Sequence, residues 1–154
     1  MNLKQKEQDL LKDLIGQEQL CIDKYGKASA QARDPQLKSL FSDIAGVEQR
    51  HKQTLTQIAG GTVPNMGGGA GSADFAGRTF AATYGTADDE NKKNDCFLCS
   101  DLLATEKHAS HLYDTCVFEF CDAGVRSVLN DLQTQEQEHG KAIYEYMATN
   151  NMYS

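Results

Sequence analysis

The chain has 154 residues, of which 22 are acidic and 15 are basic, so its formal net charge at pH 7 is −7. This length suits one domain, and an acidic chain without a Lys/Arg cluster argues against nucleic acid or a membrane surface as a partner. Hydrophobic residues make up 40% of the chain in short runs, which excludes a membrane span, and the first residues lack the apolar segment of a secretory signal. The odd number of cysteines, five, suits reduced thiols, so we expect an intracellular, cytoplasmic location.

The first half of the sequence predicts two helices. Apolar residues recur at steps of three and four through 11–25, the period of an amphipathic helix, which we place at about 4–32. Asp34 and Pro35 then form a break, because Asp is a good N-cap and Pro fits the first helical position. The same period continues over about 35–58, the second predicted helix.

Glycine separates this half from the next. Eight of the 13 glycines lie between Gly60 and Gly85, so about 59–87 reads as a glycine-rich linker. Two further helices are predicted beyond it, at about 88–121, capped by Thr86 or Asp88, and at about 123–149. The sequence therefore predicts one all-α domain over 1–154, a four-helix bundle made of the hairpins 4–58 and 88–149.

The two hairpins form an internal repeat. A shift of 88 residues aligns 14–58 with 102–146 without a gap, and nine of the 45 positions are identical. The matched pairs include every acidic or histidine residue that interrupts an apolar stripe: Glu18 with Glu106, Glu48 with Glu136, and His51 with His139. The repeat predicts similar surroundings for equivalent residues.

These six residues predict a metal site. Each lies on the core face of its helix, where an unpaired carboxylate is costly, and two divalent cations would balance the four carboxylates. Glu18 and Glu48 each lie about 20 Å from the turn of their hairpin, so they should meet. A linker of about 29 residues can reach about 90 Å, enough to cross a bundle about 40 Å long. Oxygen and imidazole ligands favour Fe or Mn, with Zn an option in vitro. The alternative, chance residues on exposed faces, fits two equally spaced sets poorly.

The same residues resemble the ligand set of the ferritin-like superfamily, a Glu from each of two helices and a Glu-x-x-His from each of the others. More closely, the chain resembles the spore coat protein F-like family of spore-forming Firmicutes. The stretches that carry this second resemblance are 17–25, 34–37, 101–107 and 136–140. It covers both hairpins and implies a place in the spore coat or mother cell, with other coat proteins as partners.

Together these features predict a dinuclear Fe or Mn protein with two-electron redox chemistry on O₂ or H₂O₂, either ferroxidase-like or peroxidase/catalase-like. Glu48 and Glu136 are the expected bridging ligands, Glu18 and Glu106 are terminal, and each metal has one histidine. Two alternatives stay open: a structural coat protein whose metal site is only stabilising or vestigial, and a module that docks coat partners through its linker. A homodimer is the default oligomer.

The cysteines have weaker interpretations. Cys96-x-x-Cys99 is half of a zinc site, a redox pair, or a pair of thiols in the core or at its rim, and the last is the simplest interpretation. Cys116 and Cys121 lie about 25 Å or more along the same predicted helix, so the four cannot share one metal. Cys21, three residues after a predicted ligand, is either a further ligand or part of the core, and the core is the simpler interpretation.

Tyr25 and Tyr113 lie two turns from predicted ligands. They either assist the ligands, as hydrogen-bond or electron donors, or pack in the core with satisfied hydroxyl groups. His108 and His111 are expected in solvent, and Glu138 is given no role.

Overall fold

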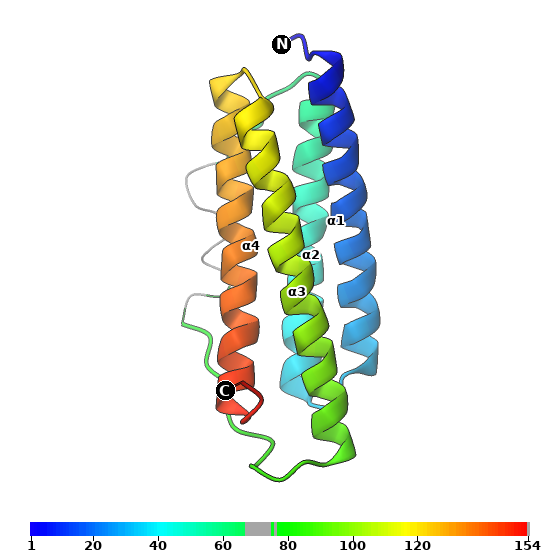
Figure 1. Ribbon diagram of the computed structural model, residues 1–154, viewed down its shortest axis with the longest axis vertical. Coiled ribbons are helices and arrows are strands. Elements are labelled where there is room, and N and C mark those ends of the chain that lie inside the picture. Colours follow the sequence, from blue (N-terminus) through cyan, green and yellow to red (C-terminus); the bar gives the residue numbers. More distant parts are fainter. Residues whose placement is uncertain (67–74, 76, 154) are drawn as a thin grey trace.

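The computed structural model describes residues 1–66, 75 and 77–153, and this part of the chain forms four α-helices and no strand. The helices are α1 (Gln5–Gln31), α2 (Pro35–Ala59), α3 (Glu90–Glu119) and α4 (Ala123–Thr149). They pack side by side along one long axis (Figure 1). The predicted all-helical class is confirmed, and every predicted helix boundary is within two residues of the observed one. Among these described residues, no helix is both long and apolar enough to cross a bilayer.

The order of the helices is set by the connection between α2 and α3. α1 runs away from the end where the N-terminus lies, α2 and α3 both run back toward it, and α4 runs away again (Figure 1). Val63, just after α2, lies against Gly124 at the start of α4. The backbone amides of Thr83 and Tyr84 instead donate to Asn150 Oδ1, beyond the end of α4. The two ends of the connection therefore lie at opposite ends of α4, and the glycine-rich stretch 67–74 lies outside the described residues.

Aspartate is the N-cap residue of three of the four helices. The carboxylates of Asp34 and Asp122, which the shift of 88 residues aligns, accept hydrogen bonds from backbone amides of the first turns of α2 and α4. The predicted cap of α3, Thr86 or Asp88, was wrong: Asp89, one residue after Asp88, accepts from the backbone amide of Lys92 at 2.7 Å. Asp89 is the last residue with extended backbone, so its carboxylate faces the free amides of the first turn.

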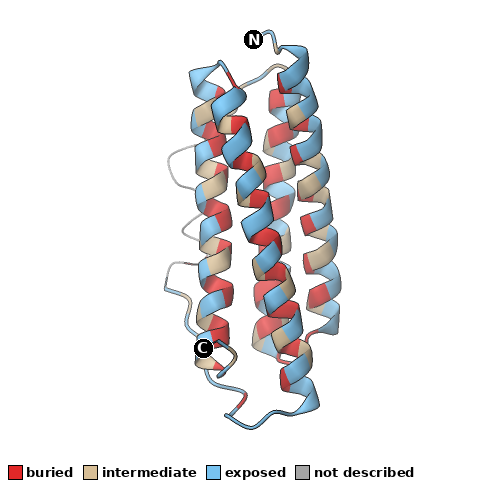
Figure 2. Ribbon diagram, viewed as in Figure 1, coloured by how far each residue is buried: buried red, intermediate tan, exposed pale blue. Residues whose placement is uncertain are grey.

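Buried residues line the inward faces of the helices (Figure 2) and form two apolar clusters. One cluster, toward the N-terminal end of α1, includes Leu11, Leu55 and Leu129. The other, toward the opposite end of the bundle, includes Phe41 and Ile143. Each fully buried side chain of this size contributes about 1.5–3 kcal/mol. The free energy gained by burying these side chains can therefore offset the cost of a polar layer between the two clusters.

Candidate metal centre

The structure brings all six predicted ligands into one layer between the apolar clusters. Each residue is at most 2% exposed. α1 contributes Glu18 to this layer and α3 contributes Glu106. The other two helices each contribute two residues one turn apart, which are Glu48 with His51 on α2 and Glu136 with His139 on α4. The spacing of three within α2 and α4 places each glutamate and histidine on the same face of the helix.

The six residues form two overlapping groups. Within each group the donor atoms lie within 4.8 Å of one another, and the groups are Glu18, Glu48, His51 and Glu136, and Glu48, Glu106, Glu136 and His139. Glu48 and Glu136 belong to both. The two imidazoles are nearly parallel, with ring centroids 5.8 Å apart and planes inclined by 17°. Such a layer could hold two metal ions, each with its own histidine and glutamate, between two shared glutamates.

Both imidazoles present the same nitrogen to the carboxylates. Nδ1 of His51 lies 2.9 Å from Glu136 Oε1 and 3.6 Å from Glu48 Oε2. Nδ1 of His139 lies 2.8 Å from Glu48 Oε1 and 3.3 Å from Glu106 Oε1. Each histidine is thus closest to the shared glutamate of the opposite hairpin, so donor atoms of all four helices converge.

Many of these converging atoms have no hydrogen bond. Among the described residues, the buried atoms without a partner include Glu18 Oε2, both oxygens of Glu48, Glu106 Oε2, Glu136 Oε2 and Nδ1 of His139. A buried carboxylate oxygen without a donor is unfavourable, and converging carboxylates also repel one another. Two divalent cations would satisfy these atoms, and a set of four carboxylates and two imidazoles fits Fe or Mn.

Without a metal ion, the cluster takes up protons. Burial, followed by the negative charge of Glu48, raises the pKa of Glu18 to about 8. Burial and the surrounding carboxylates, Glu106 first, raise the pKa of Glu136 well above its ordinary value. Burial would raise the pKa of Glu48 too, but the nearby carboxyl group of Glu18 and the two nearby imidazoles outweigh burial and hold that pKa well below its usual range. A metal ion would have to displace several of these protons.

The protonation of the two imidazoles also depends on the surrounding carboxylates. Burial by itself would lower the pKa of His51 and of His139, because a buried cation loses its hydration. Neighbouring carboxylates outweigh burial, chiefly Glu136 for His51 and Glu106 for His139, so both pKa values are raised well above the ordinary value. Protons on the rings therefore partly balance the carboxylates until cations replace them.

Tyr25 and Tyr113 each contact a glutamate of the opposite hairpin. The hydroxyl of Tyr25 donates to Glu106 Oε1 at 2.5 Å, and that of Tyr113 donates to Glu18 Oε1 at 2.6 Å. Both tyrosines are fully buried, and burial first, then the carboxylates, raises the pKa of each phenol well above its ordinary value. Each hydroxyl fixes one oxygen of its carboxylate, and the other oxygen, Oε2 in both residues, has no hydrogen-bond partner among the described residues. A role as electron donors stays a prediction.

Gln135 is a neighbour of the centre that sequence reasoning missed. Its Oε1 lies 2.7 Å from Nε2 of His51, and the residue is 7% exposed. The sequence carried one signal for it, since Gln135 is a polar residue at helical spacing between the core-facing residues Leu132 and His139. The repeat concealed it, because the equivalent position in the first hairpin is the apolar Val47.

The cysteines lie outside both groups of donor atoms among the described residues. Cys21, Cys99 and Cys116 are buried in the apolar clusters, which fits the core interpretation, whereas Cys96 is half-buried and Cys121 is exposed. Burial raises the pKa of Cys116 to about 12 and those of Cys21 and Cys99 further. Neutral buried thiols are poor ligands and nucleophiles.

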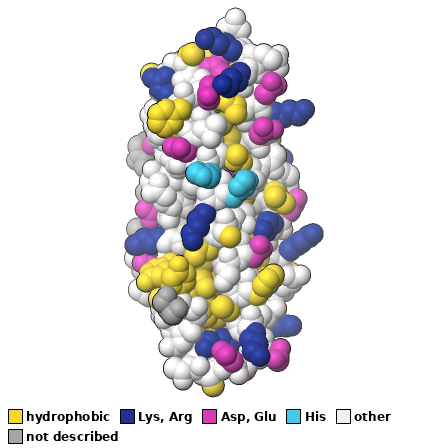
Figure 3. Space-filling view, viewed as in Figure 1, with side chains coloured by type: hydrophobic (Ala, Val, Ile, Leu, Met, Phe, Trp, Pro, Cys, Tyr) yellow, Lys and Arg dark blue, Asp and Glu magenta, His cyan; other side chains and the backbone are white. Residues whose placement is uncertain are grey.

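The two remaining histidines lie on the outer surface of the bundle, as predicted. His108 and His111 are exposed on α3. Histidine side chains are visible on the face shown in Figure 3, among scattered charged groups. They are therefore separate from the buried layer.

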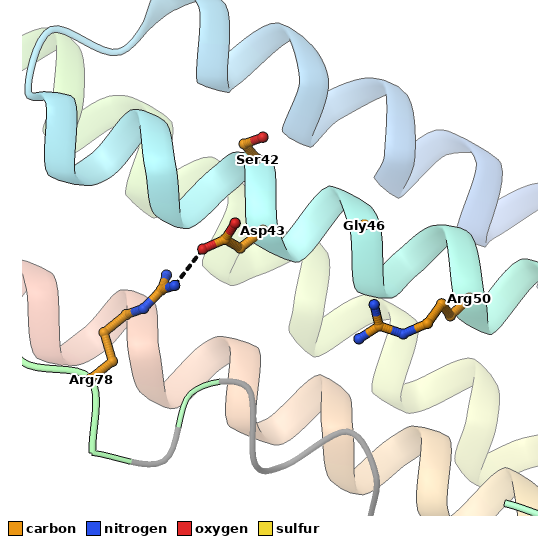
Figure 4. Close-up of a pocket in the computed structure, with 5 residues that line it drawn as sticks. All are labelled: Ser42, Asp43, Gly46, Arg50 and Arg78. Atoms are coloured by element: carbon orange, nitrogen blue, oxygen red, sulfur yellow. Dashed lines mark hydrogen bonds and ion pairs between the residues drawn. The ribbon is translucent and has the colours of Figure 1, made fainter.

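An open pocket of about 330 Å³ lies on the surface of α2, and Asp43, Arg50 and Arg78 are among its lining residues (Figure 4). The guanidinium of Arg78 pairs with Asp43 and lies 5.4 Å from the ring centroid of Phe75. The ring of Phe75 in turn meets the imidazole of His139 edge-on, with centroids 5.3 Å apart. These contacts connect the surface of α2 to the outer side of the buried layer.

Comparison with known proteins relates the second hairpin to a family. Residues 94–154 match the Coat F domain. The match covers α4 and all but the first turn of α3, so it includes Glu106, Glu136 and His139 and excludes the candidate ligands on α1 and α2. It confirms the resemblance to spore coat protein F for this hairpin. No curated protein and no solved structure matches the chain.

Proposed function

We propose that the protein is a component of the spore coat whose helical core holds two Fe or Mn ions. The Coat F domain match supports the place in the coat, with other coat proteins as partners. The metal assignment rests on one observation, the buried carboxylate oxygens that have no hydrogen bond and converge with two imidazole nitrogens. In this proposal residues of all four helices would hold the ions, and the bundle would be stabilised because binding to the folded state alone adds to its stability.

The proposal extends to the arrangement of the chain and of the ligands. The helix directions and the equivalence of the two sets of ligands support a ferritin-like bundle, made of two repeated hairpins joined by a glycine-rich crossover. Membership of Glu48 and Glu136 in both groups supports a bridging role for them, and leaves Glu18 and Glu106 as terminal ligands. Zn is an option for the protein as isolated.

The residues of this chain would prepare the site for its ions. Tyr25 and Tyr113 hold the terminal carboxylates, Gln135 holds one imidazole, and the apolar clusters keep water from the layer. Bound Fe or Mn would supply Lewis acidity and two-electron redox chemistry. The protons that the metal-free cluster carries would leave as the ions enter.

A second function, redox turnover of O₂ or H₂O₂, is favoured by the two phenols in direct contact with terminal ligands. A buried phenol beside a metal ligand can donate an electron in addition to holding the carboxylate in place. A peroxide-decay assay on the metal-loaded protein separates the two functions. Turnover that falls in both Tyr25→Phe and Tyr113→Phe would establish the redox function, and no decay above the metal-free protein would leave the structural role.

The experiment that tests the metal site is the double variant Glu48→Ala/Glu136→Ala. It removes both shared ligands, so we expect it to bind no pair of ions after reconstitution with Fe²⁺ or Mn²⁺, and its melting temperature should no longer rise with metal. The matched control is Glu138→Ala, on α4 and outside both groups, which should keep the wild-type metal content. A further control, Cys96→Ser/Cys99→Ser, should also leave the metal content unchanged. Wild-type stoichiometry in the double variant would refute the site.

A further inference from the structure

The imidazole of His51 is fixed on both of its sides. Nε2 lies 2.7 Å from the amide oxygen of Gln135, which can only accept a hydrogen bond, so Nε2 carries a proton. Nδ1 faces the carboxylates of Glu136, Glu48 and Glu18 at 2.9–3.8 Å. The hydrogen bond to Gln135 therefore sets both the ring orientation and the tautomer in which Nδ1 offers its lone pair to a metal.

The imidazole of His139 is held on one side only. Its Nδ1 faces carboxylates as that of His51 does, but its Nε2 is buried and has no hydrogen-bond partner within the described part of the chain. The edge-on ring of Phe75 is its neighbour, and Val47 occupies the position equivalent to Gln135. A ring that binds metal through Nδ1 would carry its Nε2 proton without an acceptor here.

The hydrogen bonds of the glutamates match in the two halves. Each terminal glutamate accepts from one buried tyrosine hydroxyl, at 2.6 Å for Glu18 and 2.5 Å for Glu106. Glu48 and Glu136 belong to both groups. The acceptor behind the histidine therefore distinguishes the two halves.

We propose that the two metal positions are inequivalent, and that Gln135 is the positioning residue that makes the Glu18–His51 position the tighter one. This inference rests on the proposed dinuclear site. Removing a hydrogen-bond partner of a metal-binding histidine typically weakens metal binding by about 10–100-fold, so we expect a difference of this size between the two positions. The Glu106–His139 position then loses and exchanges its ion first.

The test is a titration of the metal-free protein with Mn²⁺ alone, with free Mn²⁺ measured by electron paramagnetic resonance. The wild type should bind in two steps. Gln135→Leu keeps the side-chain size and removes the acceptor. It should still bind two ions, but the Kd of its tighter step should rise by about 10–100-fold. Gln135→Glu restores an acceptor oxygen and should restore two steps, and Gln135→Met serves as a second variant without an acceptor. Circular dichroism verifies that each variant is folded.

Two further variants assign each step to its position. Glu18→Gln should remove the tight step and leave the weak one, and Glu106→Gln should do the reverse. Two equal steps in the wild type, a weaker second step in Gln135→Leu, or loss of the tight step in Glu106→Gln would each overturn the inference while leaving the dinuclear site in place. A wild type that binds no Mn²⁺ would overturn the site as well.

Discussion

Replacing Glu18 by glutamine should stabilise the protein in the absence of metal, although it removes a predicted ligand. In the metal-free fold the pKa of Glu18 is raised by burial and by Glu48 from 4.5 to about 8, so the folded state holds a proton that the unfolded state releases at neutral pH. The stability of the metal-free wild type should therefore fall as the pH rises from about 4.5 to about 8. The glutamine of the variant needs no proton, and its amide oxygen can still accept from Tyr113.

The size of the effect follows from these pKa values. At pH 7 the proton on Glu18 costs the fold about 3 kcal/mol, because the unfolded pKa lies 2.5 units below the pH and each unit corresponds to about 1.36 kcal/mol. For a chain of this size, 1 kcal/mol shifts the melting temperature by about 2–4 °C. The Glu18→Gln variant should then melt about 6–12 °C above the wild type at pH 7, and the difference should fall below about 1 kcal/mol at pH 5.

Differential scanning fluorimetry in EDTA and in excess Mn²⁺ measures both halves of this prediction. With metal the advantage of the variant should be lost, because each ion bound at 1,000 times its Kd adds about 4 kcal/mol and the variant loses at least one. The control is Glu138→Gln, at a half-buried glutamate of α4 outside the cluster. It should leave the melting temperature unchanged both in EDTA and in Mn²⁺. A variant no more stable than the wild type in EDTA at pH 7 would refute the argument that the layer is strained without cations.

Three further predictions follow from the same contacts. The rise in melting temperature on adding Mn²⁺ should be larger at pH 8 than at pH 5.5, because protons on groups with raised pKa values, such as Glu18 and Glu136, compete with metal and also stabilise the metal-free fold; an equal rise would contradict this. Tyr113→Phe should lower the stability of the metal-loaded protein by about 1.5–3 kcal/mol through loss of a hydrogen bond to a carboxylate, yet keep the metal content by elemental analysis. In native protein at pH 8, Ellman's reagent should react rapidly with the thiols of Cys96 and Cys121 alone, and a fast phase that persists in Cys96→Ser/Cys121→Ser would show that a buried thiol is accessible.

Helices and candidate ligands were predictable because each depends on a pattern local to one helix. Apolar residues with a helical period marked the core face, and Glu18 or His51 stood out as a polar residue on that face. Asp34 and Asp122 marked the starts of α2 and α4 for an equally local reason, since an N-cap bonds to amides of the next turn. Asp89 was missed because three neighbouring residues could serve as caps, and the backbone selects the last one before the helix.

Contacts between hairpins were harder to predict. Tyr113 lies on α3 with Glu106 but donates to Glu18 of α1, and a periodic pattern within one helix cannot show how two helices are aligned. Gln135 was missed for a related reason, because the comparison of repeats selects what the halves share, whereas this residue is where they differ. The packing of the two hairpins against one another decides such contacts.

The most direct measurement of the central claim is the metal content of the purified protein. The chain would be produced in cells supplied with both Fe and Mn, and the ions per chain measured by elemental analysis, as isolated and after reconstitution. The buried carboxylates and imidazoles predict close to two Fe or Mn ions per chain. A folded protein with little or no bound metal, even after reconstitution, would contradict the account.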